Sequence, residues 1–169
     1  MASVNLKMRQ GEIVPFVFER DYLEFIQLEI SRFDQPMTRT LLEFLKKRYG
    51  HEFWYSVDIR GNQRIDGYVI AGPEMDERQL PVVHVYSIAI RKEFEGQGWA
   101  KKLMLHLIAN AKASGKDAIV LEVRDNNDRA LGFYLSLGFE ITGREDNYYD
   151  EDIDAITMRY ELRNRKSLE

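Results

Sequence analysis

Residues 88–104 read IAIRKEFEGQGWAKKLM, and this stretch decides the fold. It starts at the end of an apolar run, PVVHVYSIAI at 81–90, which is typical of a buried central strand. Two glycines, Gly96 and Gly98, follow a short polar segment, and apolar positions then recur at helical spacing. The stretch therefore predicts a buried strand, a glycine loop and a helix over about 99–114.

The rest of the chain adds strands and helices on both sides of this stretch. Apolar alternation and turn residues predict further strands at 13–18, 53–59, 65–72, 118–123, 139–143 and 155–162. Helical spacing predicts helices at 19–31, 38–50 and 127–137. The strand–helix–strand order in the middle implies a parallel pair, and the outer hairpins imply antiparallel neighbours. We expect an α/β fold (α+β in its mixed sheet) with six to seven strands and about four helices.

Length and composition limit the possible classes of protein. The 169 residues suggest a single domain over 1–169, with a core at about 12–162 and a flexible tail at 163–169. With 24 Lys and Arg against 28 Asp and Glu, the chain lacks the basic character of a nucleic-acid binder. There is no cysteine and no apolar run of the length that crosses a membrane, so we expect a cytoplasmic protein. The oligomeric state stays open between monomer and homodimer.

The glycine loop raises the possibility of a phosphate site. The N-terminus of a helix carries unpaired N–H groups and partial positive charge, so it binds phosphate well. A lone Gly-x-Gly is weak evidence, because a plain strand-to-helix turn has the same pattern. A dinucleotide fingerprint is excluded because Lys101 stands at its third glycine position, and a Walker loop is absent.

Two motifs together resemble the GNAT acetyltransferase superfamily. The loop EGQGWA at 95–100 resembles its acetyl-CoA motif, [QR]-x-x-G-x-[GA], and LEVRDNNDRALGFYLSLGFEITG at 121–143 resembles its second half. The segment NYYDEDIDAITM at 147–158 is similar to the subgroup that acetylates protein N-termini. The resemblance implies the GNAT fold and acetyl-CoA (coenzyme A) as the acetyl donor. One departure is Glu95, where the motif has Gln or Arg; either this carboxylate turns outward, or Arg91, Lys92, Lys101 or Lys102 compensates for its charge.

The resemblance also assigns residues to the cofactor. The pantetheine arm is expected along one strand, and the pyrophosphate at the glycine loop. The expected cofactor-binding residues are Ile88, Ala89, Ile90, Gly96, Gln97, Gly98, Trp99, Ala100, Lys101, Asn127, Ala130 and Tyr134.

Three residues are candidates for the proton transfers. Tyr134 is expected to protonate the leaving thiolate, although a lone helix tyrosine is more often a core aromatic. In the N-terminal subgroup, the positions of His84 and Glu122 match residues that order or deprotonate the amine. A buried carboxylate is costly without a partner, which favours a functional role for Glu122 over a structural one.

The substrate side is expected in two loops. Six of the ten residues at 145–154 are acidic, which indicates either a solvated loop or a gate whose Tyr148 and Tyr149 grip a peptide. Phe33, Pro36 and Met37 are expected on the opposite wall. No metal site is expected, because the near EF-hand at 150–161 has Ala155 where a calcium loop needs glycine. His51 and His106 are expected at the surface.

These observations predict an acetyl-CoA-dependent N-acetyltransferase, an acyltransferase whose substrates are protein or peptide N-termini, with a ribosomal protein among the candidates. The first alternative is the same fold acting on a small-molecule amine, a polyamine or a lysine side chain. The second is a non-catalytic acetyl-CoA-binding module. Neither nucleic acid nor membrane is expected as a partner.

Overall fold

The computed structural model describes residues 8–150 and 152–163. Its strands are β1 (Ile13–Pro15), β2 (Phe53–Val57), β3 (Gly67–Met75), β4 (Pro81–Ile90), β5 (Ala118–Arg124), β6 (Glu140–Asp150) and β7 (Ile153–Glu161). Its α-helices are α1 (Phe18–Arg32), α2 (Arg39–Tyr49), α3 (Trp99–Ala113) and α4 (Asp128–Leu137), and a 3₁₀ helix, η1, spans Lys92–Phe94. Nearly all of the expected tail at 163–169 lies outside the described residues. No helix of the described parts is long and apolar enough to cross a membrane.

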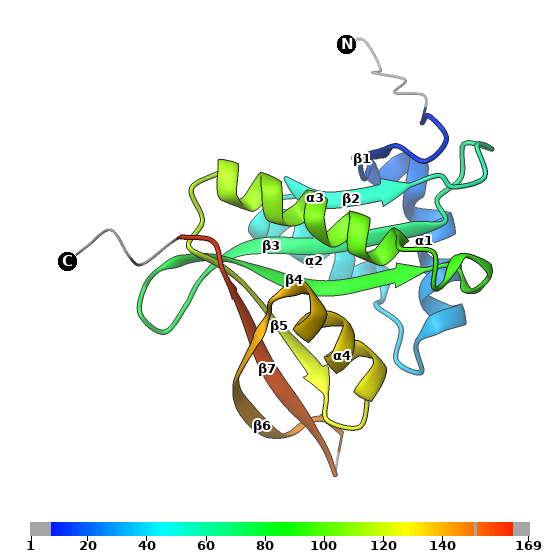
Figure 1. The fold of residues 1–169 in the computed structure, drawn as a ribbon. Coiled ribbons are helices and arrows are strands. Elements are labelled where there is room, and N and C mark those ends of the chain that lie inside the picture. The colour runs from blue at the N-terminus through cyan, green and yellow to red at the C-terminus, as the bar shows by residue number, and fades with distance from the viewer. Residues whose placement is uncertain (1–7, 151, 164–169) are drawn as a thin grey trace. The chain divides into compact units, whose positions relative to one another are not determined.

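The strands form one mixed sheet in the order β1-β2-β3-β4-β5-β7-β6 (Figure 1). Strands β4 and β5 are parallel, from Val82↔Ala118 to His84↔Val120, whereas β2 and β3 form an antiparallel hairpin. The predicted fold class is therefore confirmed, including the strand count, the four helices and the central parallel pair.

The chain divides into two compact units, and β3, β4 and α3 contribute residues to both. Unit 1 comprises Met1–Gly72 and Ser87–Leu107, and unit 2 comprises Pro73–Tyr86 and Ile108–Glu169. The expectation of a single domain stays a prediction.

Unit 1 is built on the β1-β2-β3 strands, with helices on two faces. In Figure 1, α1 and α2 lie behind β2 and β3, and the first half of α3 lies in front of them. Aromatic rings fill the core: Phe16 contacts Phe25 and Trp54 edge-on, each with ring centroids 5.8 Å apart. Burying such large apolar side chains is the main source of stability for a unit of this kind.

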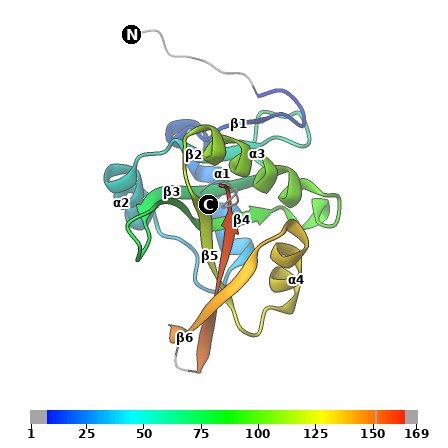
Figure 2. The same ribbon diagram turned by 60° about the vertical axis from the view of Figure 1, so that its left-hand side comes forward.

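Unit 2 is built on β5, β7 and β6. Strand β7 pairs with β5 from Ala118↔Glu161 to Arg124↔Ala155, and β6 pairs with the other side of β7. Helix α4 leads directly into β6 (Figure 2). Between them Gly138 adopts φ 101°, a left-handed conformation that favours glycine, and so reverses the chain after the helix.

Three local expectations were wrong. The strand predicted at 13–18 ends at Pro15, because Asp21 accepts a hydrogen bond from the Val17 N–H at 2.9 Å and α1 starts at Phe18. The acidic run after residue 144 is largely strand β6, not a loop. His106 is half-buried against the Tyr55 ring, 4.5 Å away between centroids, whereas His51 is exposed as expected.

Candidate active site

The glycine loop of unit 1 connects η1 to α3, as predicted. Gly96 and Gly98 adopt φ 73° and 85°, a left-handed backbone region that side chains disfavour. A Cβ built at either glycine has no heavy atom within 4 Å, so the space beside the loop is open. Glycine is therefore required here for backbone conformation, and the open side is accessible to a ligand.

Helix α3 begins immediately after this loop. Its first hydrogen bond runs from the Lys102 N–H to the Gly98 carbonyl at 3.0 Å, so the N–H groups before Lys102 lack helical partners. Lys101 is exposed, and the Lys102 ammonium lies 4.0 Å from the Trp99 ring centroid. The loop and the helix start can thus bind an anion through backbone N–H groups and the positive end of the helix dipole. The expected residues Gly96 to Lys101 are contiguous in this segment.

Ile88, Ala89 and Ile90 form the last residues of β4. Ala89 and Ile90 are buried, and Gly67 of β3 approaches them so closely that a Cβ there would lie 2.5 Å from the Ile90 side chain. The pairing of β4 with β5 runs only from Val82 to His84, and β4 then continues for several residues.

A histidine between two carboxylates lies in unit 2. The Nε2 atom of His84 is 2.6 Å from Glu122 Oε2, and its Nδ1 atom is 3.1 Å from Glu74 Oε2. The Tyr86 hydroxyl donates to the other oxygen of Glu74 at 2.6 Å. The sequence predicted His84 and Glu122 but missed Glu74, which has no motif and comes close only because β3 and β4 are neighbours.

The two carboxylates determine the charge of this histidine. Burial disfavours the imidazolium of His84, but hydrogen bonds to Glu122 and Glu74 outweigh it and raise its pKa to about 9. The hydrogen bond from His84 also lowers the pKa of Glu74. At neutral pH the side chains of Glu74, His84 and Glu122 therefore carry a net negative charge, which can attract an ammonium group.

Tyr148 and Tyr149 lie on β6 beside this cluster. The Tyr149 hydroxyl donates to the Glu122 carbonyl at 3.1 Å, and the Arg124 guanidinium lies 5.0 Å from its ring centroid. Burial, followed by the charges of Glu122, Glu145 and Glu74, raises the pKa of Tyr148, whose side chain is still 47% exposed. The two tyrosines and the carboxylates can thus contact one ligand.

Tyr134 lies on α4. The predicted motif begins with Asn127, which caps the N-terminus of this helix. The Asn127 side chain accepts a hydrogen bond from the Ala130 N–H at 3.1 Å, so these two expected residues together begin the helix. Tyr134 is buried against Phe139, with ring centroids 5.4 Å apart. Burial, followed by the charge of Tyr149, raises the pKa of Tyr134 well above its usual value, so its hydroxyl stays protonated.

The expected wall residues follow α1 in unit 1. Phe33 ends the helix and is exposed, Pro36 is half-buried, and Met37 is buried. The Met37 N–H donates to Glu29 Oε2 at 2.6 Å. The structure thus groups the predicted residues into two sets. The loop, Ile88–Ile90 and the wall belong to unit 1, whereas His84, Glu122, Asn127, Ala130, Tyr134, Tyr148 and Tyr149 belong to unit 2.

The mixed sheet with its parallel β4–β5 pair, and the glycine loop that precedes α3, are features that the acetyltransferase resemblance predicted. A sequence model of the "Acetyltransferase (GNAT) family" matches residues 17–139. The chain therefore belongs to the GNAT acetyltransferase family, as the motifs had indicated.

Individual relatives agree with this assignment. The chain is 36% identical over 108 residues to N-alpha-acetyltransferase daf-31 of Caenorhabditis elegans, a match that covers 62% of this chain and 58% of that relative. It is 30% identical over 139 residues to the ribosomal protein bS18-alanine N-acetyltransferase of Haemophilus ducreyi, covering 81% and 88% of the two chains. A chain in the crystal structure of the NatC complex bound to Gag peptide and CoA has the same fold. Its TM-score is 0.81 at 21% identity, over 91% of this chain and 99% of that one.

Proposed function

We propose that this protein transfers the acetyl group of acetyl-CoA to the α-amino group of protein or peptide N-termini. The observation that carries the proposal is the His84 side chain held between Glu74 and Glu122, with Tyr148 and Tyr149 beside it. The relatives support it, because their names describe N-terminal acetylation and the NatC complex was solved with a peptide and CoA.

The donor side of the proposal rests on backbone groups. The N–H groups of Gly96 to Ala100 would bind the pyrophosphate, the space beside Gly96 and Gly98 is open, and Lys101 would add a cation. The backbone of Ile88–Ile90 would pair with the pantetheine arm and donate an N–H to the thioester oxygen. Asn127 and Ala130 of unit 2 are further residues that the resemblance assigns to the cofactor. Acetyl-CoA itself supplies the activated thioester.

The acceptor side rests on charge. A free α-amino group has a pKa of about 7.7–8.0, so roughly a tenth is already neutral at pH 7. The negative cluster attracts the ammonium form, and Glu122 accepts its proton directly or through water. His84 is charged at this pH and therefore orients Glu122 instead of acting as the base.

The chemistry is a direct transfer without a covalent enzyme intermediate. The neutral amine attacks the thioester carbon, the C–N bond forms, the C–S bond breaks, and the nitrogen releases its extra proton to water. The thiolate leaves and takes a proton from Tyr134, which bulk water later restores. The raised pKa of Tyr134 keeps the proton available but makes the donation unfavourable before the C–S bond breaks. The proton transfer from Tyr134 to the thiolate is therefore late in the reaction.

A ribosomal protein is one candidate substrate, because the Haemophilus relative is named for one. The cytoplasmic location stays a prediction. The test is to incubate the protein with acetyl-CoA and a peptide library with free or blocked N-termini, alongside polyamines and free lysine. We expect acetylation of free-N-terminus peptides only. Transfer to small amines but not to peptides would contradict the proposal, and cofactor binding without any transfer would favour a non-catalytic module.

A further inference from the structure

The last turn of α1 contacts both ends of the segment of unit 1 that is proposed to bind acetyl-CoA, which runs from Ser87 to the glycine loop. Glu29 is 2% exposed and accepts hydrogen bonds from the Tyr68 hydroxyl, from Ser87 Oγ at 2.6 Å and from the Met37 N–H. Ser87 directly precedes Ile88, where the pantetheine arm is proposed to pair. A buried carboxylate with three donors is rigidly held, so this turn is a fixed support.

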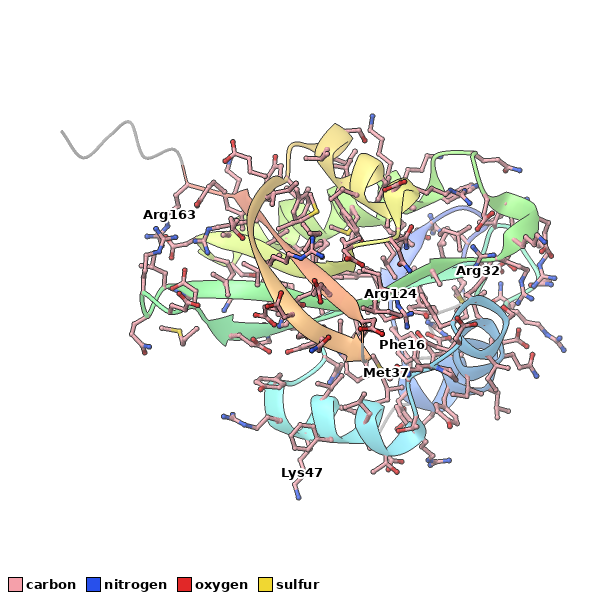
Figure 3. All side chains as sticks on the ribbon, turned by 90° about the horizontal axis from the view of Figure 1, so that it is seen from below. Phe16, Arg32, Met37, Lys47, Arg124 and Arg163 are labelled. Atoms are coloured by element: carbon pink, nitrogen blue, oxygen red, sulfur yellow. The ribbon has the colours of Figure 1, made fainter. Side chains whose placement is uncertain are left out.

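Arg32 lies on the same turn of α1 (Figure 3), and its ion pair with Glu95 reaches the other end of the segment. Its Nη2 atom forms an ion pair with Glu95 Oε1, next to Gly96 at the mouth of the glycine loop. Both side chains stay partly exposed, at 26% and 23%. The charge of Glu95 is thus compensated at least in part by Arg32.

The cations that the sequence suggested as partners of Glu95 are placed differently. Arg91 is held by Asp66 at 3.1 Å and by Glu24 at 3.2 Å. Lys102 lies over the Trp99 ring. Arg32 is a cation that the structure brings to this carboxylate, and it comes from a helix more than sixty residues away in sequence.

We propose that Arg32 is a phosphate-binding residue for the donor, and that Glu95 holds it there. A guanidinium has five N–H donors in a rigid plane, so it can bond a carboxylate on one edge and a phosphate oxygen on another. The motif of the family has Gln or Arg at position 95, and here an Arg–Glu pair provides the donors instead. The inference deepens the proposed function, because it concerns the binding of that same donor.

The charges give a distinctive pattern of mutational effects. Removing Arg32 eliminates one cation and leaves the Glu95 carboxylate uncompensated beside the phosphates, so affinity for CoA falls for two reasons. Removing Glu95 as well abolishes the repulsion and restores part of the affinity. If Arg32 only neutralised Glu95, the double variant would bind CoA as tightly as wild type, whereas a direct phosphate contact leaves the double variant weaker than wild type.

The experiment measures the dissociation constant of CoA by calorimetry for wild type, Arg32→Gln, Glu95→Gln and the double variant. We expect Arg32→Gln to weaken the affinity for CoA about tenfold or more, which corresponds to about 1.4 kcal/mol. The double variant should recover at least about threefold of that loss. The exposed Arg39–Glu43 pair of α2, 2.8 Å apart, gives the matched control, and its Gln variants should leave CoA binding unchanged. Pantetheine, which lacks the phosphates, should bind wild type and Arg32→Gln equally.

Two results would overturn the inference. One is an unchanged CoA dissociation constant in Arg32→Gln; the other is an equal loss of pantetheine binding, which would indicate general damage to the site. A partly exposed ion pair contributes little to stability, so thermal unfolding should show all four proteins folded. Wild type that binds CoA but acetylates no peptide would contradict the proposed function alone. Normal peptide acetylation with an unchanged CoA constant in Arg32→Gln would contradict the Arg32 inference alone.

Discussion

Replacing Glu74 by glutamine should lower the pKa of His84. Glu74 keeps its shape in this variant but loses the charge that His84 Nδ1 faces at 3.1 Å. A hydrogen bond to a charged group contributes about 1.5–3 kcal/mol, and one pKa unit corresponds to about 1.4 kcal/mol. The pKa of His84, about 9 in the wild type, should therefore fall by about 1–2 units.

The assay is an NMR titration of the imidazole protons. The chain has only three histidines, so variants of His51 and His106 assign the signals. Glu77→Gln, at an exposed position three residues further along, is the matched control and should leave the titration unchanged. A wild-type His84 that titrates near 6.5, or an unchanged titration in Glu74→Gln, would refute the reasoning that two carboxylates keep His84 charged.

Three further predictions concern stability, the glycine loop and the general acid. Because the folded-state pKa of His84 is raised, its stabilising contribution is complete below about pH 6.5 and is lost as pH rises through about 9. Urea unfolding should accordingly show wild type losing stability relative to His84→Gln across this window, and parallel curves would contradict the shift. Gly98→Ala places a side chain at φ 85°, costs about 1 kcal/mol and should weaken CoA binding in calorimetry; unchanged binding would remove the loop from the site. Tyr134→Phe should lower kcat by at least tenfold with little change in KM for acetyl-CoA in steady-state kinetics, and an equal change in both would remove Tyr134 from its role as acid.

Local chemistry made much of the fold predictable. Thr38 accepts from the Leu41 N–H at 3.2 Å and Gly50 ends the same helix, both as the sequence indicated. Asn127 and Gly138 likewise mark the start and the end of α4. Such signals act within a few residues, so they can be recognised in the sequence.

Two of the three errors have a common physical origin in long-range pairing. The acidic residues of β6 predicted a loop, but this strand forms the edge of the sheet and its residues 140–148 are exposed, so their charges remain in water. His106 looked like a surface residue on α3, but its ring packs on Tyr55 of β2. In each case the deciding neighbour lies on a different strand or helix.

The residues of the candidate site likewise divide into those that a motif predicted and those that only the tertiary structure brings together. The glycine loop and the pair His84 and Glu122 were predicted through their resemblance to a family. Glu74 and Arg32 were not, because neither belongs to a motif and each takes its place through tertiary structure.

The central claim is transfer to an α-amino group, and the position of the acetyl group tests it most directly. A peptide with one free N-terminus and one internal lysine is incubated with acetyl-CoA and this protein, and tandem mass spectrometry locates the product. The account predicts acetyl on the N-terminal nitrogen and an unmodified lysine. Acetyl on the lysine side chain, with the N-terminus unmodified, would contradict it.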